Sequence, residues 1–212
     1  MASATRRDVL IYDEGIVVYA AERILKGEIP YRDFWGIYPP GQFYTLALAF
    51  KLFGTSLLVE RIWEATIRLF LCLVIYRLTA KLTSPPIALT TWLLSVPVLG
   101  ATGFYGYPMF TALVLSLFSA LCLLNFLTQG RRASAPKPWL VLCGLSTGLT
   151  ALYRLDVGFY TLAAEVIVLG AFFYTSSRNL SSTPGQGSFL HSFLLYMAAT
   201  ALPVGLITAY LL

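Results

Sequence analysis

The residue types that could do chemistry gather between residues 8 and 54. Carboxylates can accept or deliver protons, and cations can hold phosphate groups. Two adjacent carboxylates stand at Asp13 and Glu14, and the charged residues Lys26, Arg32 and Asp33 follow. The plainer alternatives are that Asp13 caps a helix, that Glu14 is a favourable first-turn charge and that the loop cations are solvated. Aromatic side chains are interleaved with these charges: Tyr12, Tyr19, Tyr31, Phe34, Trp35 and Tyr38.

Two short helices should position these side chains. Apolar residues recur at helical spacing from Glu14 to Lys26, which predicts an amphipathic helix whose apolar face lies on a membrane. Gly27 should end this helix. A second, apolar helix is predicted from Gln42 to Phe53, and it ends at Gly54. Residues 1–56 therefore form one unit, an acidic and aromatic loop with interfacial helices.

The chain as a whole has the composition of a membrane protein, and its apolar stretches lie in residues 57–212. Hydrophobic residues make up 58% of the sequence and charged residues only 12%, and the mean hydropathy is +0.73. A soluble protein is usually about a quarter charged. A spanning helix needs about 20 mostly apolar residues. The predicted fold class is thus an all-α, polytopic transmembrane bundle of about six spans: Leu57–Leu78, Ile87–Thr102, Pro108–Leu127, Trp139–Tyr153, Phe159–Tyr174 and Phe189–Leu212.

The distribution of Lys and Arg predicts how the chain is oriented. One set of short loops holds most of these cations, and the cation-rich side should be cytoplasmic. Residues 1–56 then lie on the extracytoplasmic side, although no apolar helix precedes Asp13 to carry them across. We therefore expect a fragment of a longer protein that lacks a preceding helix and later helices, or alternatively a short protein with a translocated N-terminal segment. The net charge of +5 is attributed to this loop bias and not to nucleic-acid binding.

Several ionisable residues fall inside the predicted spans or at their ends. Glu64 and Arg68 are four residues apart and can pair, or they can line a donor site. Arg154 can bind phosphate or form a local ion pair with Asp156. Glu165 lies in an apolar span and must have a partner, which the sequence does not identify. His191 is interpreted as an interfacial residue, and Cys72, Cys122 and Cys143 as small core residues without a metal or disulfide role.

A family resemblance appears in the order of the N-terminal elements. Tyr12-Asp13-Glu14-Gly15 is followed by Gly27-Glu28-Ile29-Pro30-Tyr31-Arg32-Asp33-Phe34-Trp35, then by Tyr38-Pro39-Pro40-Gly41 and Leu52-Phe53-Gly54. This order resembles the first extracytoplasmic loop of GT-C-fold membrane glycosyltransferases. The most similar group is the bacterial protein O-mannosyltransferase branch, which includes the aminoarabinose transferases. The resemblance covers residues 12 to 61 well and the rest of the chain loosely.

The resemblance implies a sugar transfer in the cell envelope. The donor would be a sugar on a polyprenyl phosphate, and the acceptor a lipid, glycan or protein at the extracytoplasmic face of a bacterial inner membrane. The family's acidic motif falls on Asp13 as the catalytic carboxylate, with Glu14 as its neighbour. Lys26, Arg32, Asp33 and Arg154 are the candidates for binding the donor phosphate or substrate. No cofactor is required and no metal-ligand cluster is evident, while a carboxylate-bound divalent cation stays an alternative.

Two other classes of function remain open from the sequence. One is a non-catalytic membrane subunit that keeps the fold and binds the same lipid. The other is a lipid transporter or flippase, which predicts a polar path lined by Glu64, Arg68 and Glu165 together. A transporter built from repeats has no support, because no internal repeat is visible.

Overall fold

The computed structural model describes residues 13–102, 106–129, 137–179 and 186–212, and within those ranges the chain forms eight α-helices. The described residues contain no strand apart from an isolated bridge between Pro30 and Phe34. The all-helical prediction is confirmed. The helices are α1 (Asp13–Leu25), α2 (Gly41–Phe53), α3 (Leu57–Leu82), α4 (Pro85–Ala101), α5 (Met109–Gln129), α6 (Lys137–Tyr153), α7 (Leu155–Asn179) and α8 (Gln186–Leu211).

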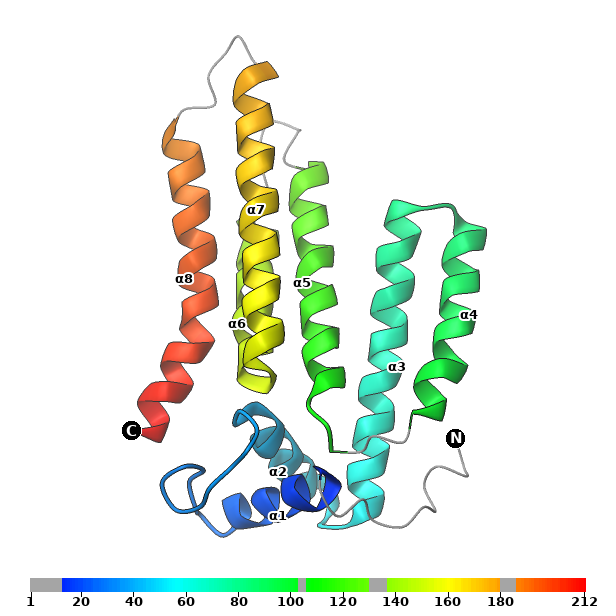
Figure 1. The fold of residues 1–212 in the computed structure, drawn as a ribbon, viewed down its shortest axis with the longest axis vertical. Helices are drawn as coiled ribbons and strands as arrows, with labels where there is room; N and C mark the ends of the chain where they lie inside the picture. Colours follow the sequence, from blue (N-terminus) through cyan, green and yellow to red (C-terminus); the bar gives the residue numbers. More distant parts are fainter. Residues whose placement is uncertain (1–12, 103–105, 130–136, 180–185) are drawn as a thin grey trace.

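Two layers make up the molecule. α3 to α8 run roughly side by side, and α1 and α2 lie across one end of them (Figure 1). α3 packs against α4 and α5, and α6 packs against α5, α7 and α8. α2 contacts both α3 and α6, so the N-terminal layer is joined to both sides of the bundle.

The observed helices extend beyond several of the predicted spans. α3 continues to Leu82 and α7 begins at Leu155, whereas the sequence predicted ends at Leu78 and a start at Phe159. Counting apolar residues omits the polar ends of a helix. Such ends are stabilised by polar side chains: Thr83, just after α3, donates from its hydroxyl to the Thr79 backbone oxygen at 2.8 Å, and Asp156 stands in the first turn of α7.

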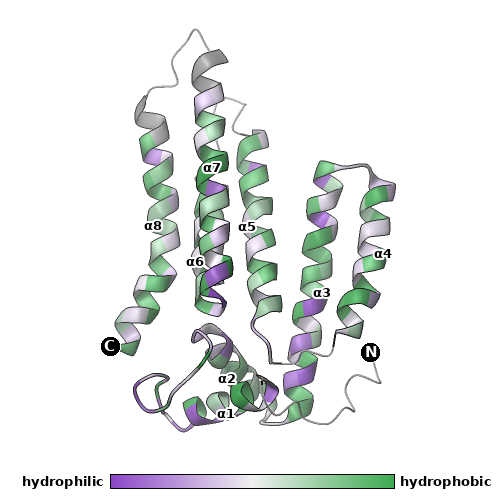
Figure 2. Cartoon of the chain, in the orientation of Figure 1, coloured by the Kyte–Doolittle hydropathy of each residue, from purple (hydrophilic) through white to green (hydrophobic). Residues whose placement is uncertain are grey.

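Three helices among the described residues are long and apolar enough to cross a membrane: Met109–Thr128, Leu155–Thr175 and Leu190–Leu211. Two shorter apolar helices, Pro85–Ala101 and Pro138–Tyr153, accompany them. α3 is not in this group, because its first half is strongly polar (Figure 2). A membrane protein with several spans is therefore supported, while the count of six stays a prediction.

The apolar face of α1 is covered by α2. Val17, Ala20 and Ala21 are buried against a cluster on α2, so the prediction that they lie on the membrane surface is wrong. Small residues on α1 let the two helices approach closely, and large residues on α2 fill the remaining space. The α2 side of this core consists of Phe43, Leu46, Ala47, Ala49 and Phe50.

A second core lies in the middle of α5, α6, α7 and α8. Cys122 and Cys143 are fully buried there, beside Phe126, Leu140 and Leu169. Cys72 is buried in α3, and none of the three forms a disulfide. The interpretation of the cysteines as core residues is therefore confirmed.

Candidate active site

A buried ion pair fixes the beginning of α1. Glu14 is fully buried, and the Arg61 side chain on α3 is only 5% exposed. Arg61 Nε donates to Glu14 Oε1 at 2.8 Å, and Arg61 Nη2 donates to Glu14 Oε2 at 3.3 Å. A bidentate contact of this kind holds the Arg61 and Glu14 side chains in one geometry. It joins segments 47 residues apart, which is why the sequence did not show it.

Arg61 belongs to a polar face that occupies the first half of α3. The residues of this face recur three, four and seven positions apart, so they share one side of the helix, and all are at most 5% exposed. They lie next to α1 and α2, where Figure 2 shows α3 as hydrophilic. The residues are Glu60, Arg61, Glu64 and Arg68.

Glu64 and Arg68 find their main contacts on other helices. Gln42 on α2 donates from Nε2 to Glu64 Oε1 at 2.7 Å. The Arg68 guanidinium carbon lies 4.6 Å from the ring centre of Phe110 on α5. The two residues also attract each other electrostatically. This part of α3 therefore ties α2 to α5. No ion pair between Glu64 and Arg68 is seen among the described contacts, so their pairing and their role at a donor site both stay predictions.

Glu60 is the residue of this face that the sequence interpretation missed. Its side chain is fully buried, and neither carboxyl oxygen accepts a hydrogen bond from any residue within the described ranges. It interacts electrostatically with Glu14 and Glu64. The signal in the sequence was the run of charges at three- and four-residue spacing in an otherwise apolar helix.

Asp13 is the first residue of α1 and directly precedes the buried Glu14. The structure describes its position in the helix and not its side chain. A side chain built on Gly15 would meet no atom within 4 Å, so the outer face of this first turn is open. The catalytic and the helix-capping interpretations of Asp13 both stay predictions.

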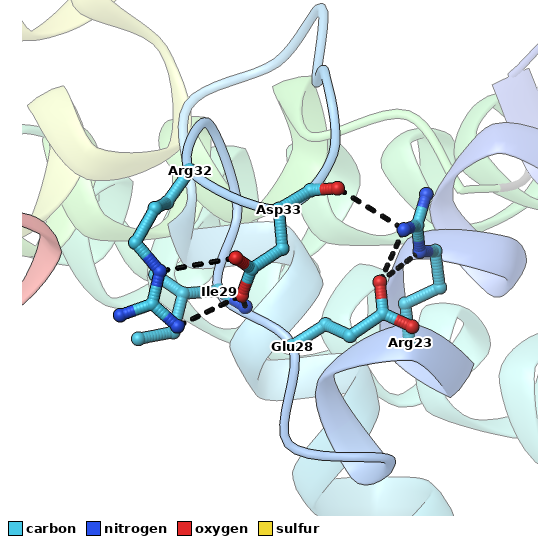
Figure 3. A network of polar contacts seen from close by, with 5 residues as sticks. All are labelled: Arg23, Glu28, Ile29, Arg32 and Asp33. Carbon is cyan, nitrogen blue, oxygen red and sulfur yellow. Dashed lines mark hydrogen bonds and ion pairs between the residues drawn. The ribbon is translucent and has the colours of Figure 1, made fainter.

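The loop between α1 and α2 is held by its own charged residues (Figure 3). Arg23 pairs with Glu28 and donates from Nη2 to the backbone oxygen of Asp33 at 3.1 Å. The Asp33 carboxylate accepts from the Ile29 N–H at 2.8 Å and from Arg32 Nη2 at 2.9 Å. The hydrogen bonds from Arg32 and then from Ile29 lower the pKa of Asp33 to about 2.

Three of the predicted substrate-binding residues lie in or next to this loop. Arg32 and Asp33 pair with each other, which is a structural role for both. Lys26 is exposed just after α1, before Gly27 turns the chain with a φ of 90°. Substrate binding by these three residues stays a prediction.

Arg154 lies where the loop layer meets the bundle. It forms an ion pair with Asp156 at 2.6 Å, and its Nη1 donates to the Tyr107 hydroxyl at 2.6 Å. Tyr107 in turn packs edge-on against Tyr38 of the loop, with ring centres 6.0 Å apart. The local ion pair that the sequence offered for Arg154 is present, and phosphate binding stays a prediction.

The partner of Glu165 is a set of three hydroxyl groups on three other helices. Ser119 on α5 donates to Glu165 Oε1. Thr147 on α6 and Tyr196 on α8 each donate to Glu165 Oε2 at 2.7 Å. The carboxyl group is 4% exposed and its hydrogen bonds cross the centre of the α5–α8 core.

The polar residues proposed for a transporter path fall into two separate groups. The partners of Glu64 and Arg68 are on α2 and α5, near the N-terminal layer. Those of Glu165 are Ser119, Thr147 and Tyr196, and no residue belongs to both sets in the described contacts. The arrangement gives no support to one continuous path. His191 is exposed near the start of α8, and no group of three or more His, Cys, Asp and Glu residues in the described ranges could hold a metal ion.

The apolar helices and the charged layer across their end define a helical membrane protein with a polar site at one end. Residues 38–206, most of the chain, match the family described as dolichyl-phosphate-mannose-protein mannosyltransferase. The chain belongs to this family, and it is therefore a membrane glycosyltransferase of the GT-C type. The match begins at Tyr38, so the acidic pair at Asp13 and Glu14 lies before the matched range. Neither the curated proteins nor the solved structures contain a match.

Proposed function

We propose that this chain transfers a sugar from a polyprenyl-phosphate donor to an acceptor at the extracytoplasmic face of a membrane, and that Asp13 is the catalytic base. The family match supports the transfer, and the buried contact between Glu14 and Arg61 is the observation that supports Asp13 as the base. Glu14 directly follows Asp13, so its buried pair with Arg61 fixes the backbone at Asp13. Burying two charges costs free energy of desolvation, which is a high cost for a turn that has only a structural role.

The reaction needs three roles. Asp13 takes the proton of the acceptor hydroxyl or phosphate, whose oxygen attacks the anomeric carbon of the sugar. The bond between that carbon and the donor phosphate breaks, and the lipid phosphate leaves with the bonding electrons. A cation must stabilise the negative charge that the phosphate gains. Arg154 is our candidate, because it is partly buried at the junction of loop and bundle while Arg32 is largely exposed.

Glu14 takes a positioning role in this scheme. Because both of its oxygens bind Arg61 and its side chain is fully buried, it orients the first turn of α1 and does not exchange protons with an acceptor.

The substitution Asp13→Asn tests the base directly. Membrane vesicles containing the chain are supplied with radiolabelled dolichyl-phosphate mannose and a peptide acceptor that carries hydroxyl groups, because the family description names that donor and a protein acceptor. We expect transfer to fall by about 10²-fold or more, because a positioned base contributes about that factor. Glu22→Gln, at a partly exposed position on the same helix, is the control and should leave transfer unchanged. Undiminished transfer by Asp13→Asn would reject the assignment.

A non-catalytic member of the same fold is the second candidate. The observation in its favour is that the family match starts after the acidic pair. Such a protein would bind the polyprenyl lipid equally well as wild type and as Asp13→Asn, and neither form would transfer sugar.

A further inference from the structure

Glu60 stands out because its surroundings do not suit a carboxylate. It is fully buried in the first turn of α3, and none of the described residues donates a hydrogen bond to either of its oxygens. A buried charge without donors costs several kcal/mol, so a group in this position is expected to be neutral or to have a cationic partner.

Among the described residues, the cations near Glu60 are already engaged in other contacts. Arg61 directs its Nε and Nη2 to the two oxygens of Glu14, and the Arg68 guanidinium lies against Phe110 while attracting Glu64. Within the described part of the chain, three carboxyl groups (Glu14, Glu60 and Glu64) thus share two guanidinium groups. One carboxyl group is in excess, and Glu60 is the one without a hydrogen-bond donor.

The groups around Glu60 come from two helices. Glu60 interacts electrostatically with Glu14 on α1 and with Arg61 and Glu64 on α3. Gln42 on α2 uses its amide to donate to Glu64. A carboxyl group that carries a proton can donate a hydrogen bond to a neighbouring carboxylate, whereas two neighbouring carboxylates repel each other.

We propose that Glu60 is a neutral, proton-holding positioning residue that donates a hydrogen bond to the Glu14 carboxylate and so completes the anchor that places Asp13. The effect of Glu60 on sugar transfer rests on the proposed function. The proton on Glu60 is a property of the folded chain and does not depend on any reaction.

Infrared spectroscopy of the purified chain in lipid nanodiscs tests the proton itself. The carbonyl stretch of a carboxylic acid is well separated from the bands of a carboxylate. The wild-type spectrum minus that of Glu60→Gln at pH 7 should contain an acid band that shifts in D₂O. Glu22→Gln, on the partly exposed part of α1, is the control and should remove only carboxylate bands. Carboxylate bands in the Glu60 difference would overturn the proposal, whatever the transfer assay shows.

The pH profile of transfer tests the positioning role. Ionisation of Glu60 at alkaline pH should place two repelling carboxylates side by side and reduce turnover. Glu60→Gln keeps an N–H donor and does not titrate, so this alkaline loss should disappear. Glu60→Leu removes the donor and should lower turnover about tenfold, the value of one hydrogen bond to a charged group, with little change in the donor KM.

An alkaline loss that is identical in wild type and Glu60→Gln would overturn the positioning role. Because the infrared result needs no activity, a failure of the proposed function appears separately, as transfer that is absent in wild type or unaffected by Asp13→Asn.

Discussion

At the scale of single residues, the most informative finding is that Glu14 is paired with Arg61 inside the protein. Its position in the first turn of α1 allowed two interpretations, a catalytic neighbour of Asp13 or a favourable first-turn charge. Burial changes the second of these interpretations, because a buried carboxylate is tolerated only with a matched cation and good geometry. The sequence contains both residues, but it does not predict that Glu14 and Arg61 are in contact.

The pair predicts a strong effect of Arg61→Leu on stability. Removing the guanidinium leaves the Glu14 carboxylate buried without its partner, which should cost about 3–5 kcal/mol of unfolding free energy. Denaturant unfolding in detergent measures this value. The double variant Glu14→Leu with Arg61→Leu should recover part of the loss, because no uncompensated charge remains.

Arg32→Leu is the control for this experiment. Its ion pair with Asp33 is exposed, and such pairs are worth at most about 1 kcal/mol. A loss for Arg61→Leu no larger than the loss for Arg32→Leu would contradict the assignment of a buried anchor.

At the scale of elements, the loop between α1 and α2 is a defined structure and not a flexible connection. Tyr31 has a φ of 67°, which is uncommon for a residue with a side chain, and its hydroxyl donates to the Tyr38 backbone oxygen. Burial raises the pKa of Tyr31 to about 12, so the phenol keeps its proton at neutral pH. The charged pairs of Figure 3 hold the other side of the loop.

The low pKa of Asp33 predicts how this loop responds to acid. The pKa of Asp33 in the folded chain is lowered from 3.8 to about 2. The stability that the ionised carboxylate gives to the folded loop is therefore complete above pH 3.8 and is lost as the pH falls through about 2. The amide resonance of Ile29, which donates to this carboxylate, should titrate with a midpoint near pH 2.

Arg32→Gln gives the comparison for this titration. It removes the largest cause of the lowered pKa and should move the Ile29 midpoint toward 3.8. An Ile29 midpoint at 3.8 in the wild type would show that the loop contacts do not persist in solution.

At the scale of the whole molecule, two polar clusters join the helices. One ties α1 and α2 to α3, and the other ties α7 through Glu165 to α5, α6 and α8. Close helix packing accompanies the second cluster. A Cβ on Gly144 would lie 2.6 Å from the Tyr196 backbone oxygen, and a Cβ on Gly148 would meet the backbone oxygen of Thr200. Two small residues four apart permit this approach of α6 and α8.

This packing predicts opposite outcomes for two glycine-to-alanine changes. Gly148→Ala places a methyl group against the α8 backbone and should destabilise the protein by about 1–3 kcal/mol. Gly170→Ala is the matched control, because a Cβ there meets no atom within 4 Å and alanine favours a helix. Thermal unfolding in detergent should therefore give a lower midpoint for Gly148→Ala and an unchanged or higher one for Gly170→Ala. Equal midpoints would contradict the close contact of α6 and α8.

Local patterns alone were sufficient for the helices and their approximate ends, and the resemblance in the N-terminal elements was sufficient for the broad glycosyltransferase family. Apolar stretches, prolines and glycines act through neighbouring residues, so they can be interpreted without the fold. The approximate start of α2 and the end of α1 at Gly27 are examples of features that the sequence predicted.

Only the tertiary structure decided which polar residues meet. Glu14 binds Arg61, and Gln42 donates a hydrogen bond to Glu64. Glu165 accepts hydrogen bonds from hydroxyl groups on three other helices. Each of these contacts joins residues that are far apart in the sequence. The apolar face of α1 likewise packs against α2 and does not lie on a membrane. An apolar face or a buried charge requires a partner, but the partner depends on which helices pack together, and that choice is made by the whole chain.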